Sequence, residues 1–365
     1  MTTWTAGWPP RNLLRSLRLP LAIGLAAGVW LLGERPLSWA AENDTAAPLL
    51  VPEKQAEVFV ELLKQRAEEL LARRRRPKTV FTVSSSLIQG YESNVALDGE
   101  KRGDFYTQET FHALLQPRLT SWLRGRVSSE LFHHHYAELR DFNIWMNTLS
   151  GTLQVLPHPR AAVEATYEYS LVNFPFNTSN SFFDKRVGVA VLFVQTGWLM
   201  HRTAWTYQLR DFDTREASNT LGNAVANVVR EDQRHAVQHE IRLRFAKTSA
   251  ALVGEYYRNL SNDQFQKFYD WDNVQIRGVL AHELTDRWQG IASAGYERRE
   301  YAERQVPAIG TTERDDLYTL AGSLVYRLTD RVQWRYSVIV RYQDSNDPRL
   351  DFTDWINEVG VTVKF

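Results

Sequence analysis

A two-residue alternation of apolar and polar side chains runs from about residue 79 to the end of this chain, and it is the feature that most constrains the fold. In the segment 332–342, the even positions carry valine, tryptophan and tyrosine, and the odd positions are mostly polar. Successive side chains of a β-strand point to opposite faces, so this segment predicts a strand with one apolar and one polar face. Segments 317–328 and 229–245 repeat the pattern. The recurrence predicts an all-β fold.

The connections between the predicted strands alternate in kind. Tight turns are expected at Arg124-Gly125, His158-Pro159, Thr196-Gly197, Lys247-Thr248, Thr285-Asp286 and Thr329-Asp330. Longer polar loops are expected at about 93–103, 138–141, 174–182, 212–228, 262–269, 301–314 and 344–350. Short turns at one end and long loops at the other are typical of bacterial outer-membrane barrels. We therefore predict a transmembrane antiparallel β-barrel of about 14 strands over residues 79–365, with both of its ends on the short-turn, periplasmic side.

The C-terminal segment indicates how the barrel closes. Valines occupy alternate positions in the last nine residues, and the sequence ends on an aromatic residue. A closed barrel has no edge, so the last strand, at 351–365, must pair with the first strand, at 79–91. An aromatic end after alternating apolar residues resembles the signal that such barrels present to the barrel assembly machinery. The residues predicted to form this signal are Val361, Val363 and Phe365.

The N-terminal segment differs from the rest of the chain. Arginines precede an apolar run at 19–32, and Ser38 and Ala40 supply small residues at the positions that a signal peptidase reads. This arrangement predicts a signal peptide over residues 1–40 and export of the mature chain. The alternative is a membrane anchor, but a spanning helix needs about 20 apolar residues.

Residues 41–78 are predicted to form a separate region with one short α-helix over 53–76, which Pro77 ends. Apolar residues share one helix face at spacings of three, four and seven: Phe59, Leu62, Leu63, Leu70 and Leu71. Three interpretations stay open, namely a solvated arm, a plug in the pore and a docking helix for a periplasmic partner. Four consecutive arginines end the helix, but an exported protein rarely meets nucleic acid.

Composition excludes several classes of function. Lys and Arg total 43, and Asp and Glu also total 43, so the chain is not a globally basic nucleic-acid binder. There is no cysteine, which excludes a disulfide scaffold, thiolate zinc sites and thiol catalysis.

A short motif closes the first predicted strand. The stretch Gly90-Tyr91-Glu92-Ser93-Asn94-Val95 is similar to one that opens many outer-membrane barrels known as putative porins. The resemblance covers about 79–365 and implies a β-barrel in the bacterial outer membrane. That family includes barrels linked to exopolysaccharide export and the barrel modules of surface lipoprotein assembly modifiers. Those relatives usually carry helical repeats ahead of the barrel, where this chain has one predicted helix.

The run His133-His134-His135 raises metal binding and catalysis. Neighbouring side chains of a strand face opposite ways, so three adjacent histidines make a poor metal site. A lipid-facing hydrolase would use Ser129 with His133 and His135, but no family motif supports it. A protease barrel would need paired carboxylates in the outer loops, where the candidates are Asp211, Asp213 and Glu216. We predict no metal, no cofactor and no enzymatic activity.

The polar face of the strands is expected to line the lumen. Rings of arginine favour anions, and guanidinium groups bind carboxylates through two hydrogen bonds. The alternative interpretation is a lattice of ion pairs that stiffens the wall. The residues predicted to set selectivity are Arg202, Arg210, Arg230, Arg234, Arg242, Arg244, Arg277, Arg331, Arg335, Arg341, Glu240 and Glu255.

These patterns predict a porin-like channel that passes small polar solutes, of anionic or sugar-like character. The alternative is a barrel component of a polysaccharide or protein export assembly, which would dock a periplasmic partner through the predicted helix at 53–76. Expected partners are outer-membrane lipid, the barrel assembly machinery, and either a second copy of the chain or a periplasmic protein.

Overall fold

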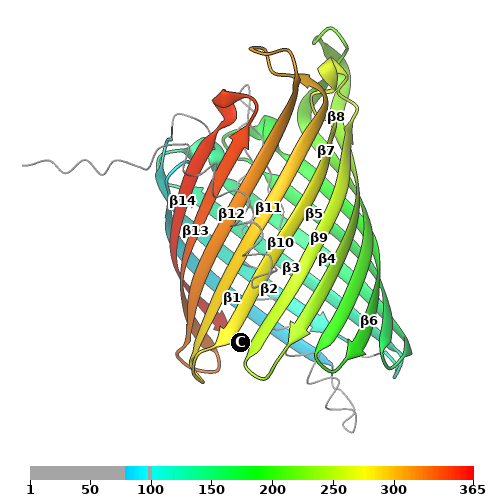
Figure 1. The fold of residues 1–365 in the computed structure, drawn as a ribbon, viewed down its shortest axis with the longest axis vertical. Coiled ribbons are helices and arrows are strands. Elements are labelled where there is room, and N and C mark those ends of the chain that lie inside the picture. Colours follow the sequence, from blue (N-terminus) through cyan, green and yellow to red (C-terminus); the bar gives the residue numbers. More distant parts are fainter. Residues whose placement is uncertain (1–78, 98–100, 118) are drawn as a thin grey trace, which may run out of the picture.

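A computed structural model describes residues 79–97, 101–117 and 119–365. Its strands close into one antiparallel barrel in sequence order (Figure 1). They are β1 (Val80–Glu92), β2 (Asp104–Gln116), β3 (Leu123–Tyr136), β4 (Ile144–His158), β5 (Ala161–Asn173), β6 (Phe182–Thr196), β7 (Leu199–Ser218), β8 (Ala224–Arg244), β9 (Thr248–Ser261), β10 (Trp271–Glu283), β11 (Trp288–Gln305), β12 (Thr312–Arg327), β13 (Val332–Ser345) and β14 (Phe352–Lys364). The prediction of a closed barrel of about 14 strands is confirmed. The predicted signal peptide and helix, with Phe59, Leu62, Leu63 and Leu70, lie outside the described residues.

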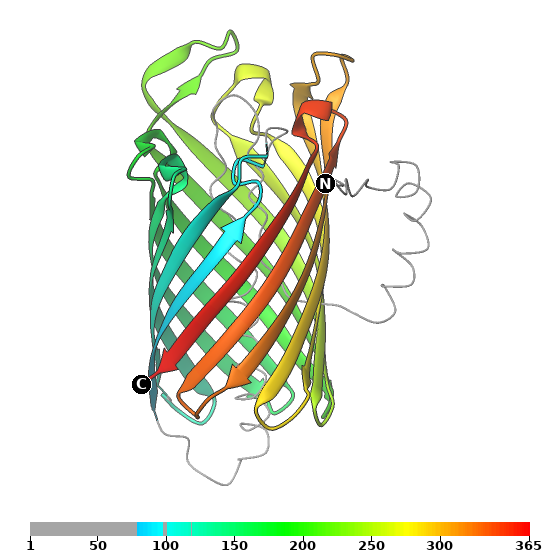
Figure 2. The ribbon, with the colours of Figure 1, turned by 90° about the vertical axis from the view of Figure 1, so that its left-hand side faces the viewer.

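The barrel closes where β1 pairs with β14, as Figure 2 shows for the first and last strands. The pairing runs from Ser84 opposite Lys364 to Glu92 opposite Ile356. The backbone N–H of Phe365 donates to the carbonyl of Val83 at 2.9 Å, so the last residue is tied to the first strand. A Cβ at Gly90 would lie 2.5 Å from the Tyr106 ring, so a larger residue there would displace that ring from the closing strands.

The two ends of the barrel differ as predicted, because short turns alternate with longer connections. Four 3₁₀ turns lie in the longer connections: η1 (Arg140–Phe142), η2 (Thr178–Asn180), η3 (Phe265–Lys267) and η4 (Pro348–Leu350).

Three predicted connections are wrong. Gly125 lies within β3, which begins at Leu123, so the turn before that strand comes earlier in the chain than predicted. Most of 212–228 continues β7 and β8, and much of 301–314 continues β11 and β12. These hairpins stand above the other connections (Figure 2). Their residues follow no apolar alternation, and the backbone pairing continues past register shifts beyond Asp211 and Glu300.

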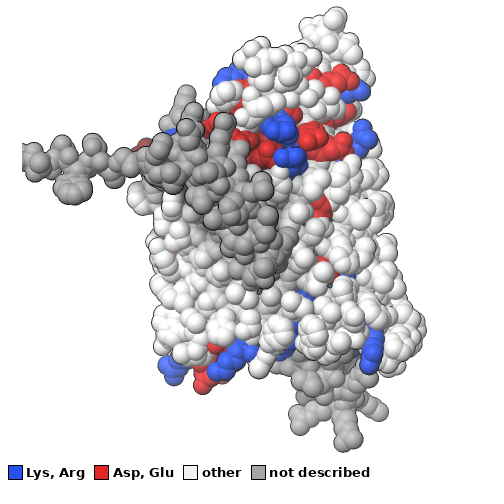
Figure 3. Space-filling view, in the orientation of Figure 1, with Lys and Arg blue, Asp and Glu red and all other residues white. Residues whose placement is uncertain are grey.

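The two faces of the wall are chemically distinct. Side chains of the outer face are exposed and mostly apolar, such as Val189, Trp205, Val237 and Leu320. Charged residues gather toward the two ends of the visible outer surface (Figure 3). An apolar outer band with charged ends is the surface that a bilayer requires of a spanning barrel. Within the described ranges, no helix is both long enough and apolar enough to cross a membrane.

Candidate lumenal binding site

The alternation of burial along each strand identifies the face of every predicted lumenal residue. Eleven of them lie on the inner face: Arg202 and Arg210 on β7, Arg230, Arg234, Glu240, Arg242 and Arg244 on β8, Glu255 on β9, Arg277 on β10, and Arg335 and Arg341 on β13. Arg331 is misplaced by the prediction, because it lies exposed in the turn between β12 and β13. The β12–β13 pairing ends at Arg327, and the turn follows it. In a turn the alternation of odd and even positions no longer decides which way the Arg331 side chain points.

The inner faces of β7 and β8 form an arginine wall. It carries six arginines and two carboxylates: Arg202, Arg210, Arg230, Arg234, Arg242, Arg244, Asp232 and Glu240. The inner faces of β14 and β1 carry three carboxylates and one lysine: Asp354, Glu358, Glu92 and Lys364. Five strands separate these two pairs of strands in either direction around the barrel. By these residues the two walls differ in charge, but most of the charges are paired: Arg202 lies 3.5 Å from Glu164, Arg210 lies 3.5 Å from Asp184, and Arg341 of β13 bridges Glu92 and Asp354.

Aromatic rings support the arginine wall near the long loops. The Arg230 guanidinium donates twice to Asp232, at 3.0 and 2.6 Å, and lies 3.2 Å over the Tyr269 ring. Arg210 lies 4.2 Å over the Phe182 ring. A cation over an aromatic face is attracted by the ring quadrupole, and the attraction grows when both groups are desolvated. The rings therefore hold these guanidinium groups in fixed positions.

Arg234 differs from its neighbours in having no carboxylate partner in the described part of the chain. It is 7% exposed, and its guanidinium lies 4.3 Å over the Tyr257 ring. Its opposite residue on β7 is Gln208, an amide and not a carboxylate. A buried charge without a partner is costly unless water or a ligand solvates it. Arg234 is therefore the group on this wall that is best placed to receive an anion.

Amides and carboxylates continue this surface onto β10 and β11. Glu297 accepts hydrogen bonds from Gln275 and Arg299, each at 3.0 Å, and from Asn273. Arg277 donates to Gln275, and its guanidinium lies 3.9 Å from Glu255. The polar side chains of neighbouring strands thus form one connected surface.

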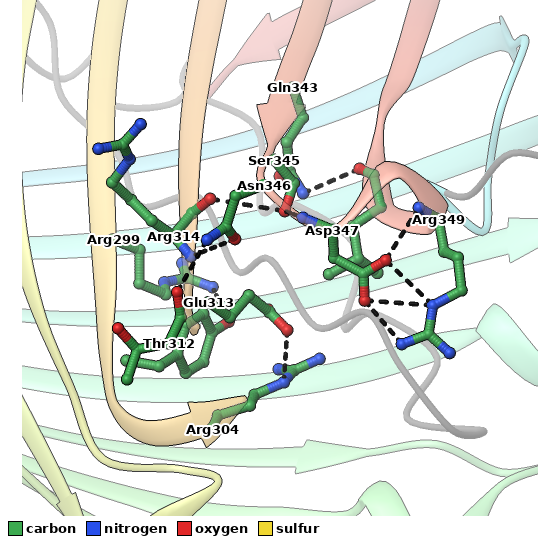
Figure 4. Close-up of polar contacts among 12 residues, drawn as sticks. Arg299, Arg304, Thr312, Glu313, Arg314, Gln343, Ser345, Asn346, Asp347 and Arg349 are labelled. Carbon is green, nitrogen blue, oxygen red and sulfur yellow. Dashed lines mark hydrogen bonds and ion pairs between the residues drawn. The ribbon is translucent and has the colours of Figure 1, made fainter. Parts of the chain in front are cut away.

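The loop end of the lumen carries further ion pairs, seen in Figure 4. Arg304 bonds Glu313 at 2.8 Å and lies 3.8 Å over the Phe268 ring. In the loop between β13 and β14, Asp347 accepts from the backbone N–H of Arg349 at 3.1 Å and pairs with its guanidinium (Figure 4). These hydrogen bonds from Arg349 hold the pKa of Asp347 below its usual value.

A second group of lumenal residues, the seam cluster, lies where the barrel closes: Glu92, Tyr106, Tyr136, Arg341, Asp354 and Glu358. Arg341 bridges Glu92 and Asp354, and the Tyr136 hydroxyl donates to Glu92 at 2.5 Å. The Tyr106 hydroxyl donates to Glu358 at 2.5 Å.

The sequence prediction missed the role of Glu92, although it lies in the motif 90–95. In the structure that motif ties the first hairpin to the last strand, because the Ser93 hydroxyl and the Asn94 backbone N–H both donate to Asp354 at 3.0 Å. The motif at 90–95 was therefore the one sequence signal that could have identified where the first and last strands are joined.

The three adjacent histidines face as the alternation predicts. His134 is buried on the inner face and stacks on the Tyr106 ring at 4.4 Å. His133 and His135 lie on the outer face, where His133 is 3.6 Å from Glu109. Among the residues that the structure describes, no group of three or more metal-ligating side chains is placed to hold an ion.

Comparison with known proteins supports a porin-like barrel. The model of the family "putative beta-barrel porin 2" matches residues 270–365, which hold β10 to β14. No curated protein matches the chain.

Several solved barrels resemble the chain in structure. OmpT of Vibrio cholerae is 11% identical, with a TM-score of 0.46 over 80% of this chain and 99% of that one. An anion-selective porin from Comamonas acidovorans is 8% identical, with a TM-score of 0.46 over 79% and 99%. The CymD monoaromatic hydrocarbon channel is 8% identical, with a TM-score of 0.44 over 82% and 93%. Scores this low carry no inference about a solute.

The resemblance that the motif at 90–95 first indicated is thus confirmed at the other end of the chain. The chain is a closed antiparallel β-barrel whose last five strands match the model of the putative beta-barrel porin 2 family.

Proposed function

We propose that this barrel is an outer-membrane channel for small anionic solutes, and that the arginine wall sets its selectivity. The observation that carries the proposal is the gathering of six arginines on the inner faces of β7 and β8, among which Arg234 has no carboxylate partner in the described chain. Fixed guanidinium groups raise the local concentration of anions and lower the barrier for their passage.

Diffusion through the lumen needs no covalent chemistry. A solute bearing a carboxylate or phosphate would exchange its hydration for hydrogen bonds from guanidinium groups, and polar amides would replace water around its other groups. Passage requires that such binding be weak enough for release. Arg234, which has no carboxylate partner among the described residues to compete with the solute, is the first residue to test.

The test is the current through the purified full-length barrel in a planar bilayer. We expect steady conductance without any partner and, in a roughly tenfold KCl gradient, a zero-current potential of the sign given by anion preference. The Arg234→Gln variant should shift this potential toward zero, whereas Arg331→Gln, which changes an exposed turn residue, should leave it unchanged. Equal potentials for the wild type and Arg234→Gln would refute the role of the wall. Silence from a verifiably folded barrel would favour the export or envelope-assembly alternative.

A further inference from the structure

The five residues that follow β1 fold into the barrel instead of standing above it. We call these residues, 93–97, the inward segment. Residues 94–97 are all at most 8% exposed, although connections between strands usually run over a protein surface. The backbone N–H of Ser93 donates to the carbonyl of Trp355 at 2.9 Å, so the segment begins against β14.

Apolar contacts join the inward segment to the inner face of the wall on both sides of β1. Val95 and Ala96 belong to one cluster with wall residues of four strands: Tyr106 on β2, Tyr136 on β3, Ile339 on β13 and Ile356 on β14. Leu97 packs in a second cluster with Leu317 on β12 and Phe352 on β14. Inner-face side chains point into the lumen, so a segment that packs on them occupies part of the lumen.

These contacts lie below the loop end of the wall. Towards the loops, β13 continues past Ile339 to Ser345, and β12 extends beyond Leu317 to its first residue, Thr312. At about 3.3 Å per residue, the two strands extend roughly 15–20 Å beyond the contacts. The inward segment therefore lies inside the mouth of the barrel.

Hydrogen bonds hold the inward segment in this position. The Ser93 hydroxyl and the Asn94 backbone N–H both donate to Asp354, each at 3.0 Å. The backbone N–H of Val95 donates to the carbonyl of Arg102 at 2.9 Å. Polar and apolar contacts together make the segment a fixed part of the lumen.

The size of the inner-face side chains changes along the barrel. Towards the short turns, half-buried serines and threonines line the wall: Thr82, Ser84, Ser86, Ser128, Ser150, Thr152, Ser293, Ser323 and Thr362. Towards the loops, the inner face carries large buried side chains such as Phe132, Tyr257 and Trp271. Small side chains fill less of a barrel interior, so more of the lumen is left open in the half away from the inward segment.

We infer that the inward segment is the constriction of the channel and sets the size of the largest solute that passes. It takes up space at the loop end of the lumen, where the wall side chains are already large. A solute that passes it enters a wider region lined by hydroxyl groups. This inference rests on the proposed function and adds to it, because the arginine wall selects the charge of the solute and the inward segment limits its size.

Conductance of the full-length barrel in a planar bilayer, with polyethylene glycols of increasing mass as size probes, tests the inference. Leu97→Gln places an amide against Leu317 and Phe352 without changing the charge of the lumen. Burying that amide is unfavourable, so the segment should leave the wall, the single-channel conductance should rise at least about twofold, and larger polymers should enter. The matched control is Ile309→Gln, at the 57% exposed tip between β11 and β12, which should change neither quantity.

A shortened loop provides a second variant in case Leu97→Gln does not fold. In it, Asn-Gly replaces residues 96–101, because the Val95 N–H already bonds the Arg102 carbonyl and a two-residue Asn-Gly turn closes such a pair. This variant should also conduct more and admit larger polymers.

Both variants keep the arginine wall, so the sign of the zero-current potential should not change. Anion-selective conductance with the same magnitude and the same polymer limit in the wild type and the folded variants would overturn this inference and leave the proposed function standing. Silence from every folded barrel would overturn the proposed function and this inference together.

Discussion

The seam cluster and the arginine wall lie in the same lumen but hold their guanidinium groups differently. At the seam, both oxygens of Glu92 and of Asp354 accept hydrogen bonds, and Arg341 is held between the two carboxylates. On the arginine wall, Arg234 lies 4.3 Å over the Tyr257 ring and has no carboxylate partner in the described chain. The difference teaches that the arginines of one lumen are not equivalent: Arg341 helps to hold the closing strands together, whereas Arg234 joins no such ion pair in the described chain.

The seam needs this matching because it joins distant parts of the chain. Arg341 and Glu92 are 249 residues apart, and pairing β14 with β1 closes the longest loop in the barrel. Closing such a loop costs conformational entropy, which the hydrogen bonds of the seam cluster help to offset.

The largest effect on stability should come from breaking the seam. Arg341→Leu leaves Glu92 and Asp354 buried without their cation, which should lower the free energy of unfolding by about 3–5 kcal/mol. The urea midpoint of the folded barrel, followed by its gel mobility, measures the loss. Arg335→Leu on the same strand is the control, and an equal loss in both variants would contradict a special role for the seam.

A pair of tyrosines compares the two walls directly. Tyr106→Phe removes a buried hydrogen bond to Glu358 and should cost about 1.5–3 kcal/mol. Tyr257→Phe, under the Arg234 guanidinium, removes a hydroxyl that makes no side-chain hydrogen bond to the described residues and should cost less than about 0.5 kcal/mol. Denaturant unfolding measures both. If Tyr257→Phe costs as much as Tyr106→Phe, the claim that the two walls differ in how fully their polar groups are paired is wrong.

A smaller, pH-dependent effect is expected at the loop that leads into β14. Because the pKa of Asp347 is depressed in the folded state by its bonds to Arg349, its contribution is present above the unfolded pKa of about 3.9 and is lost as the pH falls through the lower folded value. Asp347→Ala should therefore lower stability by about 1 kcal/mol near pH 6 and by much less near pH 2.5.

Thermal unfolding of both proteins at the two pH values provides the measurement. Asp330→Ala, which changes an exposed turn residue at the other end of the barrel, is the matched control and should show no such difference between pH values. A gap between wild type and Asp347→Ala that stays constant with pH would show that the carboxylate is not the source.

The smallest effect on stability is expected for Arg234→Gln. Arg234→Gln removes the contact with the Tyr257 ring but also relieves the cost of a buried charge that no carboxylate in the described chain pairs. These two terms oppose each other, so the free energy of unfolding should change by less than about 0.5 kcal/mol. Denaturant unfolding of Arg234→Gln and Arg341→Leu, each compared with the wild type, measures the difference between the two walls. A loss comparable to that of Arg341→Leu would make Arg234 a structural residue.

The sequence predicted the barrel and the face of almost every strand residue. Side chains of a strand alternate between its two faces, and in a barrel wall those two faces are the apolar outside and the polar lumen. It misplaced Arg331, since parity has no meaning in a turn. It also treated the ends of β7 and β8 as loops, because strands that leave the bilayer no longer need an apolar face.

The candidate site was predicted only as a set of arginines. Which arginine meets a carboxylate depends on the register between strands, and the sequence does not show that Arg234 lies opposite Gln208 or Asp232 opposite Arg210. The seam cluster joins residues from both ends of the chain, so no local pattern reveals it.

The most direct test of the central claim is the zero-current potential of the wild-type barrel in a KCl gradient. A lumen whose arginine wall controls passage should show a potential of the sign given by anion preference. A potential near zero, or one of the sign given by cation preference, from a folded and conducting barrel would contradict the account.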